Sequence, residues 1–324
     1  MPFARLAAAT TPTAHIGFGL AAIGRPGYIT LGRDADLPPS RSVEALRERT
    51  LELLDAAYAS GVRYFDVARS YGRSEEFLAD WLHARPDIRD VVVGSKWGYT
   101  YTAAWHTEVD GPHEVKDHSV AAYVRQREES AELLGDRLDL YQIHSVTPES
   151  PALGDKELHA RLADLAAEGV TVGLSVSGPE QAAAIRAALA VTVEGEPLFR
   201  TVQATYNALE TSAEPALAEA HDAGLTVLVK EGMANGRLAG EHAPAALREV
   251  ADATGLGCDA VALALALRKP WAGVVLSGAA TSVQLVSNLH AAAVDLDAEQ
   301  LERLAGLVEE PAVYWERRGQ LPWN

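Results

Sequence analysis

Short apolar runs alternate with longer amphipathic segments along almost the whole chain, a pattern typical of alternating strands and helices. The apolar runs predict strands at 17–20, 63–66, 91–96, 138–143, 170–176, 201–204, 225–229 and 273–277. The amphipathic segments predict helices at 42–59, 75–84, 119–134, 156–168, 179–189, 213–223, 244–254, 259–267, 283–293 and 299–308. Uninterrupted alternation implies a parallel sheet with right-handed crossovers, and about eight such units predict a closed barrel. The expected fold class is therefore α/β, a single (β/α)8 TIM barrel.

No stretch rich in proline, glycine or serine divides the chain, so the prediction is one domain over residues 1–324. This length is also usual for one such barrel with insertions. The third predicted strand is followed by a long loop, residues 97–118, which carries several aromatic side chains and three histidines. Long ordered loops in compact domains are usually functional, so this loop is expected to border a binding site. The alternative, that its aromatic residues only pack on one another, stays open.

Composition narrows the range of partners. A formal net charge of −17 argues against nucleic acid or an anionic membrane as the main partner, and a solvated acidic surface accounts for it. The single cysteine, Cys258, excludes an intramolecular disulfide bond and fits a reducing compartment. No apolar run is long enough to span a bilayer, and residues 1–14 lack the apolar core of a signal peptide. We therefore expect a cytoplasmic protein, whose oligomeric state stays open.

Four side chains with useful chemistry follow consecutive predicted strands. Asp66 and Lys96 end the second and third strands, Tyr71 lies in the loop after Asp66, and His144 ends the fourth strand. Loops after the strands form the functional face of a barrel, and neighbouring strands lie about 4.8 Å apart, so these side chains are expected to meet. A helix should begin soon after Tyr71, with Ser74 as its N-cap. Each residue alone has an ordinary structural explanation, but their coincidence at successive strand ends favours a site.

This arrangement suggests a general acid. A free tyrosine has a pKa of about 10, and a nearby ammonium group favours the phenolate and lowers that value. We therefore expect Lys96 to lower the pKa of Tyr71 and Asp66 to hold Lys96. Tyr71 would then protonate a carbonyl oxygen as the carbonyl becomes an alcohol, while His144 hydrogen-bonds and orients the same oxygen.

The segments around these residues resemble the signature blocks of the aldo-keto reductase family; the blocks are 64–66, 71–75, 95–98 and 139–144. The resemblance covers nearly the whole chain, from Gly17 to about Ala293. It implies a (β/α)8 barrel in which Asp66, Tyr71, Lys96 and His144 are the catalytic tetrad. It also implies an NAD(P)(H)-dependent oxidoreductase that interconverts an aldehyde or ketone and the corresponding alcohol. Hydride would come from C4 of the nicotinamide, the proton from Tyr71, and the tail 314–323 would fold over the barrel mouth.

By the same resemblance, ten later residues are expected to bind the cofactor: Ser175, Gln203, Lys230, Gly232, Asn235, Arg237, Ser277, Gly278, Gln284 and Asn288. The chain departs from the family pattern at three places. Val176 stands where the family has asparagine. Lys230 stands where an aromatic ring usually stacks on the nicotinamide, and it could meet a cofactor phosphate or pair with Glu231. No lysine or arginine lies between Ser277 and Asn288, where a 2′-phosphate would need cations, and this weakens the family's usual preference for NADPH. Arg237 or Lys230 could supply the missing cation, so the choice between NADP(H) and NAD(H) stays open.

The substrate side is expected in the long loop, with Trp97, Tyr99 and Trp105 as binding residues for a small carbonyl or alcohol compound. One rival interpretation is a non-catalytic nucleotide-binding barrel that regulates a partner protein, which the intact tetrad disfavours. Another is a metal-dependent hydrolase. The three histidines of the loop have no strand-end carboxylates beside them, so we expect no metal site.

Overall fold

The computed structural model of the chain describes Phe3, Leu6 and residues 11–324. Most of residues 1–14, for which no signal peptide is expected, therefore lies outside the described residues. The prediction of one domain over residues 1–324 stays a prediction.

Eight strands form the centre of the molecule: β1 Ile16–Gly19, β2 Tyr64–Asp66, β3 Val92–Trp97, β6 Leu140–Val146, β7 Thr171–Val176, β10 Thr201–Thr205, β11 Thr226–Lys230 and β12 Ala272–Ser277. They pair in parallel and close into a barrel in the order β1, β12, β11, β10, β7, β6, β3, β2. The strands are short. They are mostly apolar because both of their faces are buried, the outer one under the helices and the inner one against side chains in the barrel interior. The predicted eight-stranded parallel barrel is confirmed.

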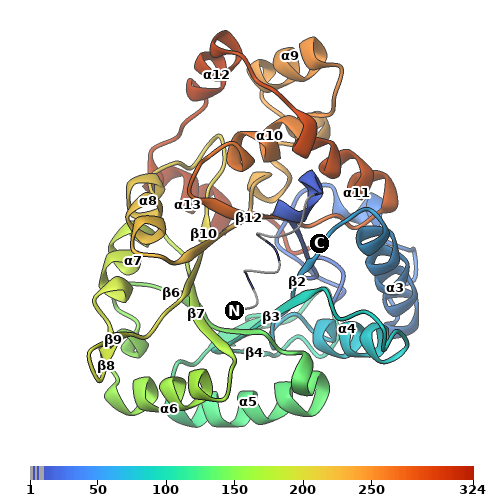
Figure 1. The fold of residues 1–324 in the computed structure, drawn as a ribbon. Coiled ribbons are helices and arrows are strands. Elements are labelled where there is room, and N and C mark those ends of the chain that lie inside the picture. Colours follow the sequence, from blue (N-terminus) through green and yellow to red (C-terminus); the bar gives the residue numbers. More distant parts are fainter. Residues whose placement is uncertain (1–2, 4–5, 7–10) are drawn as a thin grey trace.

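The helices surround these strands (Figure 1). Their bounds are α2 Arg33–Asp36, α3 Val43–Ala59, α4 Ser74–His83, α5 Val120–Leu134, α6 Lys156–Ala167, α7 Gln181–Leu189, α8 Glu214–Asp222, α9 Ala245–Thr254, α10 Cys258–Leu267, α11 Ser282–Leu289, α12 Ala298–Ala305 and α13 Pro311–Gly319. Short 3₁₀ turns are η1 Pro12–His15, η2 Gly135–Arg137, η3 Pro151–Leu153, η4 Ala234–Gly236, η5 Gly240–His242 and η6 His290–Ala293. Among the described residues, no single helix is long and apolar enough to cross a bilayer. The sharply bent pair α9 and α10 has the required length and composition only when the two helices are taken together.

Several helices begin where a side chain can satisfy a free backbone N–H group. Ser42 caps α3 and Ser119 caps α5, each accepting a hydrogen bond from the N–H group three residues later. The expectation that Ser74 caps α4 is wrong. Arg73 is the N-cap residue, and Ser74 is the first helical residue, its buried hydroxyl donating to the carbonyl oxygen of Ala68 at 3.3 Å.

Besides the one-turn helix α2 and the 3₁₀ turns, three elements were not expected from the pattern. The long loop after β3 contains an antiparallel hairpin of β4 Tyr99–Tyr101 and β5 Glu114–Lys116. A second small hairpin joins β8 Thr192–Val193 and β9 Glu196–Pro197, and the tail forms α13. In addition, β6 continues to Val146, so that His144 lies within the strand instead of at its end.

Alternation along the strands decides which side chains face the barrel interior, because residues two apart in a strand share a face. One buried apolar cluster fills the interior at the amino-terminal end and includes Tyr64, Val92, Leu140, Leu228 and Val274. Two or four positions further along the same strands, the inward residues are polar: Asp66, Lys96, His144 and Lys230. The interior is therefore closed by apolar side chains at one end, and its polar groups gather at the carboxyl ends of the strands.

Candidate active site

The four residues predicted to be catalytic lie together at the carboxyl ends of β2, β3 and β6. The ammonium group of Lys96 forms an ion pair with Asp66 and also donates to the carbonyl oxygen of Val67 at 3.0 Å. The same nitrogen lies 4.9 Å from the centre of the Tyr71 ring. The hydroxyl of Tyr71 is 3.3 Å from Nε2 of His144. Short strands with alternating side chains thus bring together residues that lie up to 78 positions apart, from Asp66 to His144.

Asp66 is held by neutral donors as well as by Lys96. Its Oδ1 atom accepts hydrogen bonds from the hydroxyl of Tyr64 at 3.1 Å and from Nε2 of Gln203 at 2.9 Å. Lys96 and Asp66 are both almost fully buried. A buried ion pair is tolerated only when additional hydrogen bonds satisfy its remaining polar atoms, and these contacts supply them.

The electrostatics of Tyr71 differ from the expectation. Burial raises the pKa of Tyr71 well above its ordinary value, the negative charge of Asp66 raises it further, and Arg25 lowers it by a smaller amount. The expected net lowering of the pKa of Tyr71 is wrong for this structure, because burial and the charge of Asp66 outweigh the effect of the nearby cations. The phenol is therefore protonated at neutral pH, which is the form that can donate a proton.

His144 is neutral for a related reason. Burial lowers the pKa of His144 well below its ordinary value, and the nearby cations Lys96, Lys230 and Arg25 lower it further. A neutral imidazole carries one N–H donor and one acceptor nitrogen, so it can hydrogen-bond both Tyr71 and a polar ligand.

Two adjoining cavities open at this end of the barrel. The first has a volume of about 200 Å³ and is lined by Tyr71, His144 and Asp66 among others. The second has a volume of about 340 Å³ and is lined by residues that include Gln284 and Asn288. The two share wall residues, which are Ala22, Tyr28, Thr30, Met233, Gly236 and Gly278. Together they form an elongated site with two compartments.

Most of the residues predicted to bind a cofactor line these cavities. The first cavity contains Gln203, Lys230, Gly232, Asn235, Ser277 and Gly278, and the second contains Gly278, Gln284 and Asn288. Two residues lie elsewhere. Ser175 is fully buried, and its hydroxyl accepts a hydrogen bond from the N–H group of Ser145 at 2.7 Å. Arg237 forms an ion pair with Glu309 on the side of the barrel mouth, next to α13.

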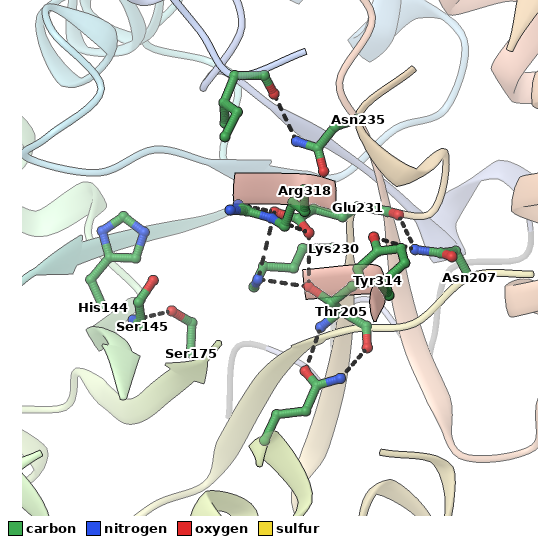
Figure 2. Close-up of polar contacts among 12 residues, drawn as sticks. His144, Ser145, Ser175, Thr205, Asn207, Lys230, Glu231, Asn235, Tyr314 and Arg318 are labelled. Carbon is green, nitrogen blue, oxygen red and sulfur yellow. Dashed lines mark hydrogen bonds and ion pairs between the residues drawn. The ribbon is translucent and has the colours of Figure 1, made fainter. Parts of the chain in front are cut away.

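Lys230 belongs to a charged network on the wall of the first cavity, and Figure 2 shows this network with His144 to its left. Its ammonium group donates to the hydroxyl of Thr205 at 2.8 Å and lies 3.9 Å from a carboxylate oxygen of Glu231. Arg318 of α13 contacts both carboxylate oxygens of Glu231 (Figure 2). Of the two alternatives left open by the sequence, the described contacts therefore favour pairing of Lys230 with Glu231.

The same network ties the tail to the barrel. Tyr314 accepts a hydrogen bond from Asn207 at 3.0 Å, and Arg318 and Trp323 line the first cavity. The tail therefore covers part of the barrel mouth, as expected. The role of Arg318 was not predicted, because the sequence shows only that the tail is basic and aromatic, without the carboxylate that it meets.

Arg25 is a second feature that sequence patterns did not reveal. It is almost fully buried, and its guanidinium group lies 5.3 Å from the centre of the Tyr71 ring and 4.9 Å from that of Trp323. It donates to Glu114 of β5 at 2.8 Å. Arg25 comes from the irregular segment between β1 and α2, where neither strand nor helix periodicity marks a position as buried.

Of the three residues expected on the substrate side, one contacts the catalytic residues and two lie elsewhere. The Tyr99 ring packs edge-on against His144, with ring centres 5.1 Å apart. Trp97 does not face the cavity, because it follows Lys96 directly in β3 and therefore points to the opposite face, where it packs against Tyr123. Trp105 also lies outside the two cavities and donates to the carbonyl oxygen of Arg41 at 2.8 Å.

Within the described part of the chain, no group of three or more acidic, histidine or cysteine residues is arranged to hold a metal ion.

The ion pair of Glu231 and Arg318 should make the stability of the protein depend on pH in acid. Burial alone raises the pKa of Glu231, but Arg318, Lys230 and the hydrogen bonds from Arg318 and Thr205 outweigh it and lower the pKa from 4.5 to about 2. Since the folded value lies below the unfolded one, this contact stabilises the protein above pH 4.5 and the contribution is lost as the pH falls towards 2.

We expect Arg318→Met to lower the free energy of unfolding by about 3 kcal/mol at neutral pH, because it leaves a buried carboxylate without its main cation. Urea unfolding at several pH values measures this loss. The adjacent Arg317→Met is the matched control, since Arg317 is 57 % exposed, and it should cost less than about 1 kcal/mol. Equal losses in the two variants would contradict the assigned role of Arg318.

Comparison with known proteins agrees with this fold. The model of the aldo/keto reductase family matches residues 16–309. The chain is 26 % identical over 348 residues to aldo-keto reductase str7 of Strobilurus tenacellus, with 96 % of each protein covered. It is 24 % identical over 311 residues to protein tas of Escherichia coli K12, covering 78 % of this chain and 86 % of tas.

Among solved structures, an aldo/keto reductase from Klebsiella pneumoniae in complex with NADP and acetate has a TM-score of 0.65 at 24 % identity, with 90 % of each chain covered. At this identity the likeness concerns the fold alone. The family match, by contrast, extends over most of the sequence, from β1 to beyond α12. This chain belongs to the aldo/keto reductase family.

Proposed function

We propose that this protein is a nicotinamide-dependent oxidoreductase that reduces an aldehyde or ketone to the corresponding alcohol, or catalyses the reverse reaction. The observation that carries the proposal is the hydroxyl of Tyr71, 3.3 Å from His144, in a cavity above the buried pair of Lys96 and Asp66. A phenol in this position can protonate a carbonyl oxygen, and general acids of this kind accelerate reactions by about 10²–10⁴-fold.

The two adjoining cavities fit a dinucleotide cofactor. The cofactor supplies a hydride donor at its nicotinamide C4 atom, and the cavity of Tyr71 is the compartment where a carbonyl group would need it. Gly278 lines both compartments, and a side-chain carbon built on it would have no atom within 4 Å, so open space lies in front of it. The buried Oδ1 atom of Asn235 has no hydrogen-bond partner among the described residues and can accept one from a ligand in the first cavity. The NADP bound to the Klebsiella relative supports the same class of cofactor.

The residues of this chain then have distinct roles. Tyr71 donates the proton to the carbonyl oxygen, and neutral His144 hydrogen-bonds that oxygen and sets its position. Lys96, fixed by Asp66, supplies a cation beneath the Tyr71 ring and stabilises the phenolate that remains after proton transfer. Gln203 holds Asp66 in place from the other side. A small-molecule substrate and a reducing compartment such as the cytoplasm suit an acidic chain whose one cysteine is unpaired.

We expect the purified protein to oxidise NADH or NADPH when a reactive aldehyde such as 4-nitrobenzaldehyde is added. The absorbance of the reduced nicotinamide measures the rate directly. Nucleotide binding without turnover of any aldehyde, ketone or alcohol in a broad panel would instead favour a non-catalytic, regulatory barrel. Absence of both binding and turnover would contradict the proposed function altogether.

A further inference from the structure

The second cavity, which would hold the adenosine end of the cofactor, is acidic. We propose that it selects NAD(H) and rejects NADP(H), with Asp36 as the main residue that discriminates between them. The inference rests on the proposed function and names the cofactor that this function leaves open. Three features support it: two carboxylates line the cavity, neutral side chains donate hydrogen bonds to them, and the nearby arginines bind other groups.

Two carboxylates line the cavity, Asp36 at the end of α2 and Asp259 in α10. Asp36 accepts a hydrogen bond from Nε2 of Gln284 at 2.7 Å. Asp259 accepts hydrogen bonds from Ser287 at 2.9 Å and from Asn288 at 2.7 Å. All three donors are neutral, and among the described residues neither carboxylate forms an ion pair. Within these contacts, neither carboxylate of the cavity wall meets a cation.

The nearest cations are engaged elsewhere. Arg33 also lines the cavity, but its guanidinium group is buried and donates to backbone carbonyl oxygens, including those of Ala22, Pro26 and Arg25. Arg49 donates to the carbonyl oxygens of Asp36 and Ala280 and lies 3.8 Å from Glu52, without lining the cavity. The segment from Ser277 to Asn288, which forms one wall, contains no lysine or arginine.

These charges suit a ribose hydroxyl and oppose a phosphate. A 2′-phosphate carries a charge of about −1.5 to −2 at neutral pH and needs cationic donors. Beside Asp36 and Asp259 it would meet two like charges in a partly enclosed space, where repulsion is stronger than in open water. A ribose 2′-hydroxyl is a hydrogen-bond donor that a carboxylate accepts, and acidic residues serve this purpose in other NAD-binding folds.

The test is to measure dissociation constants by calorimetry for NADH and NADPH, and for the adenosine fragments 5′-AMP and adenosine 2′,5′-bisphosphate. The fragments report on the second cavity without the nicotinamide. We expect the wild-type protein to bind NADH at least about tenfold more tightly than NADPH, with the same order for the fragments. Asp36→Asn keeps the acceptor for Gln284 but removes the charge, and it should reduce this preference several-fold. Asp34→Asn, the same change at a 70 % exposed residue of the same helix, should leave the preference unaltered.

The outcomes separate this inference from the proposed function. Equal or tighter binding of NADPH by the wild-type protein would overturn the inference and leave the proposed function intact. An unchanged preference in Asp36→Asn, in a variant that binds NADH normally, would overturn the role of Asp36. If neither dinucleotide binds, the proposed function fails together with the inference.

Discussion

Replacing Tyr71 by phenylalanine is expected to lower kcat for aldehyde reduction by about 10²–10⁴-fold, the usual contribution of a general acid. The hydroxyl of Tyr71 is the protonated group that lies 3.3 Å from His144 in the first cavity. Phenylalanine keeps the ring that packs over Lys96 and next to Arg25, so the fold and the affinity for nucleotide should change little. Steady-state kinetics together with nucleotide titration measure the two effects separately.

Tyr141→Phe is the matched control for this change. Tyr141 lies in β6 as His144 does, but its hydroxyl is buried in the helix layer, 3.2 Å from the hydroxyl of Ser130. Removing that hydroxyl should cost some stability and leave kcat close to that of the wild type. If Tyr71→Phe and Tyr141→Phe retain equal activity, Tyr71 is not the proton donor.

The barrel was predictable because its signal repeats. Eight apolar runs, each followed by an amphipathic segment, specify parallel strands and covering helices without any knowledge of contacts. The meeting of Asp66, Lys96 and His144 followed from the same regularity. The carboxyl ends of the strands gather at one end of a barrel, and every second side chain of a strand faces the interior. Such features depend on local order and on the general geometry of the fold.

The features that were missed depend on single long-range contacts. Arg318 binds Glu231 across 87 positions, and nothing near either residue indicates the other. The pKa of Tyr71 is raised where a lowering was expected, because the burial of the phenol and the charge of Asp66 depend on the folded surroundings and not on the sequence near Tyr71. Ser74 satisfied the residue preference for an N-cap, but its hydroxyl points to Ala68, which only the folded loop makes available.

The hairpin of β4 and β5 was missed for a different reason. Its strands have three residues each and are largely exposed, so they lack the apolar alternation that marks a half-buried strand. Yet Glu114 of β5 is the residue that pairs with Arg25 beside Tyr71. Because the pattern is weak here, no single residue of the long loop could be connected with the site in advance.

The second large effect is expected from Lys96→Met, which should lower the free energy of unfolding by about 3–5 kcal/mol and abolish measurable carbonyl reduction. The substitution preserves much of the side-chain volume but leaves the carboxylate of Asp66 buried without its cation, beside the neutral donors Tyr64 and Gln203. Urea unfolding measures the loss of stability, and Lys156→Met, at an exposed residue of α6, provides a control that should cost almost nothing.

The double variant Lys96→Met with Asp66→Asn separates the structural from the chemical role of the pair. Removing both charges eliminates the uncompensated carboxylate, so a substantial part of the stability lost in Lys96→Met should return. Activity should not return, because the stabilised variant still lacks the cation that lies 4.9 Å from the Tyr71 ring and would stabilise its phenolate. Recovery of turnover along with stability would mean that Lys96 acts only by holding the barrel interior together, and that Tyr71 donates its proton without help from a nearby cation.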